Sequence, residues 1–145
     1  MSKAYIPAEL RQHVVVRARR CCEYCLLFED DSYYALQIDH IISEKHGGET
    51  QEANLALACA FCNRAKGSDI GSVDPQTEAF VRFYNPRTDR WTEHFELDGA
   101  RIAPLTDIAR VTERLLQLNL RERLLERESL RGVGRYPPEV IDLAD

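Results

Sequence analysis

The sequence predicts an α+β fold that forms one domain of 145 residues. Apolar residues recur every fourth position near the N-terminus, which is typical of a helix, whereas short aromatic and branched runs are typical of strands. Two Cys-x-x-Cys pairs, a metal-ligand spacing, lie in the first half of the chain. We therefore expect a single domain over residues 1–145, with a metal-bearing core at about 20–70 and a C-terminal extension at about 75–145.

Composition excludes several classes of protein. Hydrophobic residues make up 44% and charged residues 30% of the chain, which is ordinary for a globular protein and wrong for a disordered one. No apolar run approaches the roughly 18 residues that a membrane span needs. Residues 1–13 lack the apolar core of a secretory signal, so we expect a cytoplasmic protein with no membrane partner.

The net charge of −5 argues against a protein that coats nucleic acid non-specifically, because such binding scales with the number of lysine and arginine contacts. The local field decides the affinity of one cleft, however, and five basic residues flank the cysteines. They are Arg17, Arg19, Arg20, Arg64 and Lys66. Composition therefore permits a nucleic-acid partner without establishing one.

The core is expected to contain two helices and a strand. Residues 7–20 read as a helix because Pro7 suits a first helical position and an apolar stripe accompanies it. The stripe consists of Ile6, Leu10, Val14 and Ala18. A strand is expected over residues 33–38, and a second helix over residues 52–65, beginning around Asn54.

The extension is expected to be loop-rich over residues 67–90 and regular afterwards. A strand over residues 91–97 is predicted to pair with residues 101–103 across Asp98-Gly99, which is a hairpin turn signal. Two helices are expected to follow, over residues 106–118 and 120–131. Their apolar face is a candidate homodimer surface.

Four cysteines are predicted to hold a structural zinc ion. They are Cys22, Cys25, Cys59 and Cys62. Each pair places two thiolates on one tight turn, and four sulfurs form the closed tetrahedral site of structural zinc, which leaves no position free for substrate. The alternatives are buried free cysteines or a redox pair, but nothing in the sequence suggests the βαβ unit of a thioredoxin-like protein.

Cys21 is a fifth cysteine, and it competes with Cys22 for the first ligand position. A ligand at Cys21 would leave three residues between the paired cysteines instead of two. We therefore predict that Cys22 is the ligand and that Cys21 is a small buried hydrophobic residue.

Several short motifs lie among and after the cysteines. They are Asp-His-Ile at residues 39–41, Gly-Gly at 47–48, Asn-Leu at 54–55, Asn63 directly after the second cysteine pair, and Lys-Gly at 66–67. In this order and spacing, residues 20–67 resemble the HNH endonucleases that carry a four-cysteine zinc site. The resemblance implies a small ββα-metal core and metal-dependent cleavage of DNA. Residues 83–87 and 91–95 are similar to a bacterial branch of the same family.

The chemistry of phosphodiester hydrolysis suits the Asp-His pair. The reaction needs an activated water, neutralisation of charge on the phosphate and help for the departing oxygen, and one divalent ion supplies the last two. The carboxylate of Asp39 is a natural ligand for such an ion, and the imidazole of His40 can take a proton from water at neutral pH. Because adjacent side chains on a strand point to opposite faces, the backbone must bend there, or the two must approach the phosphate from different sides.

The resemblance assigns the remaining roles. It implies that Asp39 is a metal ligand, that His40 is the general base, that Asn54 orients His40 by hydrogen bonding, and that Asn63 is the second metal ligand. The family usually has histidine where this chain has Asn63, and an amide oxygen is a harder ligand, so magnesium or manganese is favoured as the catalytic ion. Asn54 is also a good helix cap, and both roles are compatible.

Two basic residues after the second cysteine pair are candidate phosphate contacts, a role that positions nucleic acid without reading its sequence. Lys66 matches the Lys-Gly motif of the family, whereas Arg64 is equally well explained as a solvated helix charge. The other histidines, His13, His46 and His94, are expected to be structural or to lie on loop surface.

The leading functional hypothesis is a DNA endonuclease of the HNH type. The alternatives are a zinc module that binds nucleic acid or protein without catalysis, and a nuclease that acts on RNA. Asp39, His40 and Asn63 favour catalysis because a binding module does not need them.

Overall fold

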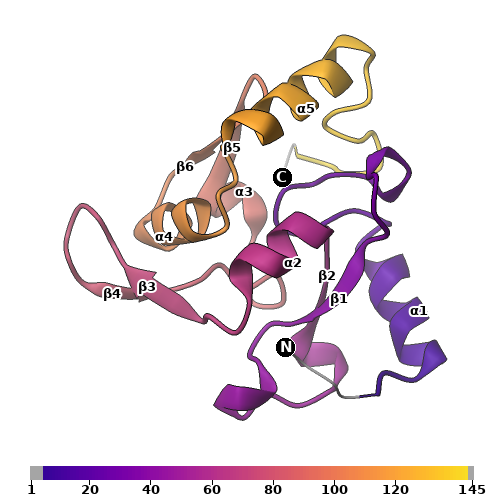
Figure 1. Ribbon diagram of the computed structural model, residues 1–145, viewed down its shortest axis with the longest axis vertical. Helices are drawn as coiled ribbons and strands as arrows, with labels where there is room; N and C mark the ends of the chain where they lie inside the picture. Colours follow the sequence, from indigo (N-terminus) through magenta and orange to yellow (C-terminus); the bar gives the residue numbers. More distant parts are fainter. Residues whose placement is uncertain (1–4, 144–145) are drawn as a thin grey trace.

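The computed structural model describes residues 5–143, and its core is a β-hairpin with a helix on each face. Strand β1, Gln37–His40, pairs antiparallel with β2, Leu55–Ala58. Helix α1, Ala8–Arg17, precedes the hairpin, and helix α2, Ala60–Lys66, follows β2 almost directly. Figure 1 shows α2 between the hairpin and the helices of the extension.

The residues of β2 are all buried, and they alternate between two clusters. Leu55 and Leu57 pack with Val14 of α1. Ala56 and Ala58 belong to the larger cluster, which includes the four paired cysteines and much of the extension. The strand is therefore covered on both faces, which explains its continuous apolar sequence.

Residues of β1 also alternate between the α1 face and the α2 face, because directly paired residues of two strands share a face. Ile38 lies opposite Leu57 and joins the α1 cluster. Asp39 lies opposite Ala56, so its side chain points to the α2 face. The sheet thereby places one acidic side chain beneath α2.

The extension adds two further hairpins and three helices. The elements are β3 (Gly71–Val73), β4 (Phe80–Arg82), α3 (Trp91–His94), β5 (Phe95–Asp98), β6 (Arg101–Pro104), α4 (Asp107–Leu115) and α5 (Arg121–Gly132). Short 3-10 turns occupy Glu29–Asp31, Glu44–His46 and Glu52–Asn54. No helix among residues 5–143 combines the length and the apolarity needed to cross a membrane.

Several predicted elements are confirmed. The N-terminal helix forms, and two helices follow the hairpin as α4 and α5. Strands β5 and β6 pair as expected, but the turn between them is Gly99-Ala100, because Asp98 still pairs with Arg101. Helix α4 begins after Thr106, whose Oγ1 accepts a hydrogen bond of 3.1 Å from the backbone N–H of Ala109. This is a standard N-cap.

Two predictions in the core are wrong. The strand expected over residues 33–38 starts only at Gln37, and Tyr33 and Tyr34 are exposed. Their aromatic character suggested a strand, but only residues 37–40 find a partner in β2. The helix expected over residues 52–65 is instead a 3-10 turn, strand β2 and the shorter α2, because a short buried apolar run suits either structure.

Two predictions in the extension also need correction. The strand expected over residues 91–97 begins with the helical turn α3 and becomes a strand only at Phe95. The region at 67–90 contains the β3–β4 hairpin. Asp74 organises the turn of this hairpin by accepting hydrogen bonds from the backbone N–H of Gln76 and the hydroxyl of Thr77.

An ion pair fastens the extension to the core. The backbone N–H of Glu23 donates to the carbonyl of Leu57 at 2.8 Å, and one carboxylate oxygen of Glu23 accepts from the Leu57 N–H at 2.8 Å. The other carboxylate oxygen binds the guanidinium of Arg87. Glu23 thus covers the outer edge of β2 and ties residues 85–87 of the extension to it.

Candidate metal centre and active site

Four cysteine sulfurs converge between the two Cys-x-x-Cys turns. The Sγ atoms of Cys22, Cys25, Cys59 and Cys62 all lie within 4.8 Å of one another, and all four residues are buried. The Sγ atoms of Cys25 and Cys59 are 3.8 Å apart. Zinc–sulfur bonds of about 2.3 Å in a tetrahedron put the sulfurs roughly 3.8 Å apart, so the cluster fits a structural zinc ion.

Backbone amides orient the sulfurs. The N–H of Cys25 donates to Sγ of Cys22 at 3.5 Å, and the N–H of Cys62 donates to Sγ of Cys59 at 3.4 Å. Cys59 is the N-cap of α2, so the second contact is also the cap of that helix. Donors directed at each pair favour the thiolate form that binds a metal.

Cys21 lies outside this cluster, as predicted. Its side chain is buried and its thiol donates to the backbone carbonyl of Arg19 at 3.3 Å. Burial raises the pKa of Cys21 to about 12, helped by the nearby charges of Cys25 and Glu29. The side chain is therefore a buried thiol, whereas its neighbour Cys22 points into the metal site.

Asp39 is buried beneath α2 with both carboxylate oxygens engaged. Its Oδ2 accepts a hydrogen bond of 2.8 Å from the hydroxyl of Tyr24, and its Oδ1 lies 3.2 Å from Nζ of Lys66. The same ammonium donates to the backbone carbonyl of His40 at 3.0 Å. Burial raises the pKa of Asp39, whereas Lys66 and the Tyr24 hydroxyl act to lower it.

Asn63 lies on the same face of the hairpin as Asp39. Its Nδ2 donates to Oε1 of Gln37 at 2.5 Å, and Gln37 is two residues before Asp39 on β1. This bond uses the amide nitrogen and leaves the amide oxygen, which is the atom that can bind a cation, outside it. Asn63 and Lys66, one helical turn apart on α2, therefore both face β1.

The imidazole of His40 has a different hydrogen-bond partner from the neighbouring Asp39 carboxylate. Its Nε2 lies 2.9 Å from Oγ1 of Thr50, and the residue is buried at the end of β1. The partners of Asp39 come from the cysteine turn and α2, whereas the partner of His40 comes from the loop before β2. The two adjacent side chains thus have separate supports, in agreement with strand alternation.

Comparison with family models covers this part of the chain. Residues 22–69 match the HNH endonuclease family. The match confirms the resemblance drawn from the motifs, although it covers less than half of the chain. Comparisons with curated proteins and with solved structures gave no significant match. The small hairpins, the helices and the cysteine cluster agree with an α+β HNH core, and the match supports a nuclease-family function in general terms.

Within the HNH segment, the side chain of Asn54 bonds the backbone of the loop between β1 and β2. It does not make the expected hydrogen bond to the His40 ring. Its Oδ1 accepts from the backbone N–H of Ile42 at 2.8 Å, and its Nδ2 donates to the carbonyls of Ile42 and Glu49 at 2.9 Å. The side chain therefore closes the loop between β1 and β2, and it acts on His40 only through that loop.

The two candidate phosphate contacts, Lys66 and Arg64, differ in exposure. Lys66 is 2% exposed and pairs with Asp39, so its ammonium is not open to a phosphate in this structure. Arg64 is exposed on α2, with its guanidinium 5.6 Å from the centre of the Phe61 ring. Sequence reasoning did not identify Tyr24, Gln37 or Thr50, because no motif marks them.

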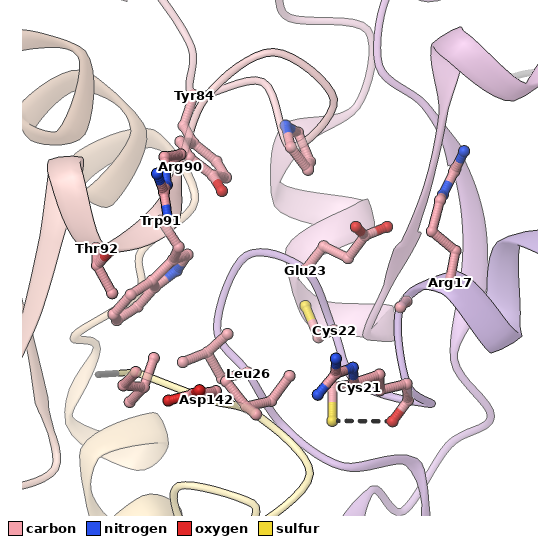
Figure 2. A pocket seen from close by; sticks show the side chains of 15 residues that line it. Arg17, Cys21, Cys22, Glu23, Leu26, Tyr84, Arg90, Trp91, Thr92 and Asp142 are labelled. Carbon is pink, nitrogen blue, oxygen red and sulfur yellow. Dashed lines mark hydrogen bonds between the residues drawn. The ribbon is translucent and has the colours of Figure 1, made fainter. Parts of the chain in front are cut away.

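A separate cavity of about 360 Å³ lies between the segment 17–26 and residues 84–92 of the extension, with Glu23 in its lining. Figure 2 shows Arg17 on one side of this cavity and Trp91 with Arg90 on the other. Of the predicted site residues only Cys22 lines it. The cavity is therefore distinct from the Asp39 face, and the indole N–H of Trp91 is occupied by the carbonyl of Tyr24 at 2.9 Å.

Proposed function

We propose that this chain is a metal-dependent endonuclease that hydrolyses phosphodiester bonds in DNA, with His40 as the general base. The observation that carries the proposal is the arrangement on one face of the hairpin within the HNH segment. There, the Asp39 carboxylate lies beneath α2. Asn63 of α2 bonds Gln37, two residues before Asp39 on the same strand, and His40 ends that strand.

The donor set of this face suits a hard divalent cation. Asp39 and Asn63 would hold Mg²⁺ or Mn²⁺ through one carboxylate and one amide oxygen, which is the small protein contribution typical of magnesium sites completed by water and substrate phosphate. When bound, the ion supplies Lewis-acid stabilisation of the charge on the phosphate and on the departing oxygen. The four-cysteine zinc has no open position and serves the fold.

His40 is placed to move one proton. We assign Nε2–H as the donor to Oγ1 of Thr50, at 2.9 Å, which leaves Nδ1 without its proton and able to accept one from the attacking water. The contact with the Thr50 hydroxyl then fixes the orientation of the ring. Thr50 is in this way a positioning residue for the general base.

Lys66 and Asn54 hold Asp39 and His40 in position without touching the substrate. Lys66 binds the carboxylate of Asp39 and the carbonyl of His40, and so fixes the two residues relative to each other. Asn54 closes the loop that follows His40. The burial of Lys66 argues for this positioning role over a direct phosphate contact, whereas exposed Arg64 keeps the phosphate role.

The first test is cleavage of supercoiled plasmid by the purified zinc-loaded protein, with Mg²⁺, with Mn²⁺ and with neither. We expect nicked or linear DNA, with 5′-phosphate ends, only when one of the ions is present. A structured RNA of similar length is incubated in parallel. Cleavage of RNA alone would replace DNA as the substrate, and DNA binding without cleavage would leave a zinc module in place of the enzyme.

A further inference from the structure

Helix α5 carries two buried arginines one helical turn apart. Arg123 is 6% exposed and Arg127 is 2% exposed. A guanidinium keeps its charge in any protein environment and is almost never fully buried without partners. The contacts of each side chain therefore show which charge or dipole offsets it.

The two arginines have different surroundings. Arg127 donates through Nε to the carbonyl of Ala100 at 2.8 Å and through Nη2 to Oδ1 of Asn119 at 3.1 Å. Both acceptors are neutral. Tyr136 covers it with a ring centre 5.9 Å from the guanidinium carbon.

Arg123 turns one edge of its guanidinium to the metal site. Its Nη2 lies 3.0 Å from Sγ of Cys62 and 3.7 Å from Sγ of Cys59. Its Nη1 donates to the backbone carbonyls of Leu116 and Gln117, directly after α4. The guanidinium carbon of Arg123 also lies 4.3 Å from the centre of the Phe61 ring, so sulfur, carbonyl and ring contacts together fix the guanidinium.

Charge accounts for this arrangement. One Zn²⁺ ion with four thiolates carries a net charge of −2, and such an excess is costly in a buried site unless cations or donors face it. The guanidinium of Arg123 contacts two ligand sulfurs and supplies such a cation, whereas Arg127 has no sulfur among its hydrogen-bond acceptors within residues 5–143.

We propose that Arg123 is a positioning residue of the zinc site, which hydrogen-bonds the Cys62 and Cys59 sulfurs and offsets part of the negative charge of the metal–thiolate cluster. The inference rests on zinc at the four cysteines and not on nuclease activity. Arg123 lies outside the HNH segment at residues 22–69. The extension therefore contributes a component of the metal centre, and removal of α5 weakens zinc binding.

The test is an equilibrium competition for zinc between the full chain and a chromophoric chelator. Arg123→Gln removes the charge, and Arg127→Gln is the matched control, because it removes an equally buried arginine one turn away that does not bond a sulfur. Loss of an outer-shell partner typically costs about 10–100-fold in metal affinity, and we expect Arg123→Gln to fall in that range. Arg127→Gln is expected to lower the thermal midpoint of the protein and leave its zinc affinity at the wild-type value.

Two conservative variants, Arg123→Lys and Arg127→Lys, keep the test decisive if the glutamine variants do not fold. Arg123→Lys keeps a cation but loses the planar fork, so it is expected to bind zinc less tightly than Arg127→Lys and more tightly than Arg123→Gln. Equal zinc affinities for the wild type and Arg123→Gln would overturn the proposal. An equal loss in the Arg123 and Arg127 variants would also overturn it, since the effect would then follow from packing.

Discussion

The ammonium of Lys66 lies 3.2 Å from Oδ1 of Asp39, and the side chains are only 2% and 4% exposed. The two residues come from α2 and β1, so this buried ion pair joins the helix to the strand that carries the Asp-His pair. The Tyr24 hydroxyl and the His40 carbonyl complete the hydrogen bonds around it. The metal-binding carboxylate of the proposed mechanism is therefore a buried group that also joins α2 to β1.

Substitution of Lys66 by Met is expected to destabilise the protein strongly. The change leaves the Asp39 carboxylate buried without its cation, and breaking a buried pair from one side typically costs about 3–5 kcal/mol. The double variant Asp39→Asn/Lys66→Met leaves no buried charge behind and should recover part of the loss. The free energy of unfolding is measured by urea denaturation of zinc-loaded protein.

Arg64→Met provides the control for this pair, because Arg64 lies on the same helix but is exposed. Its effect is expected within about 0.5 kcal/mol, as for most surface substitutions. A Lys66→Met variant as stable as Arg64→Met would show that the Asp39–Lys66 contact does not exist in solution.

The adjacent cysteines at positions 21 and 22 are expected to respond differently to the same substitution. Cys22→Ser removes a zinc ligand and should abolish stoichiometric zinc binding and, with it, much of the folded structure. Cys21→Ser replaces a thiol that donates to the backbone carbonyl of Arg19 and lies outside the cysteine cluster, so it should retain one zinc per chain. Zinc content by elemental analysis, together with circular dichroism, separates the two. Zinc loss in the Cys21 variant with retention in the Cys22 variant would reverse the ligand assignment.

Asp74 is expected to link stability to acid pH. Hydrogen bonds from Arg110 hold the pKa of this carboxyl well below its ordinary value of 3.8, with the Gln76 N–H and the Thr77 hydroxyl acting in the same direction. A depressed pKa means that the stabilisation is complete above pH 3.8 and is lost as the pH falls through the lower pKa of the folded state. Asp74→Asn should therefore be less stable than the wild type at neutral pH, and the difference should shrink below pH 3.8.

Thermal midpoints of the two proteins at the same pH values test this prediction, because zinc release in acid affects both alike. Asp98→Asn, an exposed position in the β5–β6 hairpin, is the control and should show no such trend. A difference between Asp74→Asn and wild type that stays constant from neutral to acid pH would contradict the role of the Arg110 contact.

The parts of the fold that sequence could predict are those that depend on residues close together in the chain. Each Cys-x-x-Cys pair shares a turn because its two ligands are three positions apart, and the prediction that the two pairs meet rested on the four ligands that structural zinc requires. The β5–β6 hairpin is confirmed because Gly99 supplies the positive φ that its tight turn needs, although the turn is Gly99-Ala100 and not Asp98-Gly99. The Asp-His motif predicts chemistry for the same reason, since its two residues are adjacent, although their catalytic roles remain predictions.

The remaining features depend on contacts between distant residues. Leu55 and Leu57 suit a helix or a strand equally, and only pairing with β1 makes them a strand. Lys66 looks like a surface charge until α2 packs on Asp39, and Arg123 looks like a solvated helix residue until α5 meets the cysteines. Side-chain partners at such separations do not follow from local pattern.

The most direct test of the central claim compares His40→Ala with His46→Ala in cleavage of supercoiled plasmid, with Mg²⁺ or Mn²⁺ and equal zinc content in each protein. His46 lies exposed in a short turn after β1 and has no place in the proposed mechanism. We predict that His40→Ala abolishes ion-dependent cleavage and that His46→Ala cleaves like the wild type. Full cleavage by a zinc-loaded, folded His40→Ala protein would contradict the assignment of His40 as general base.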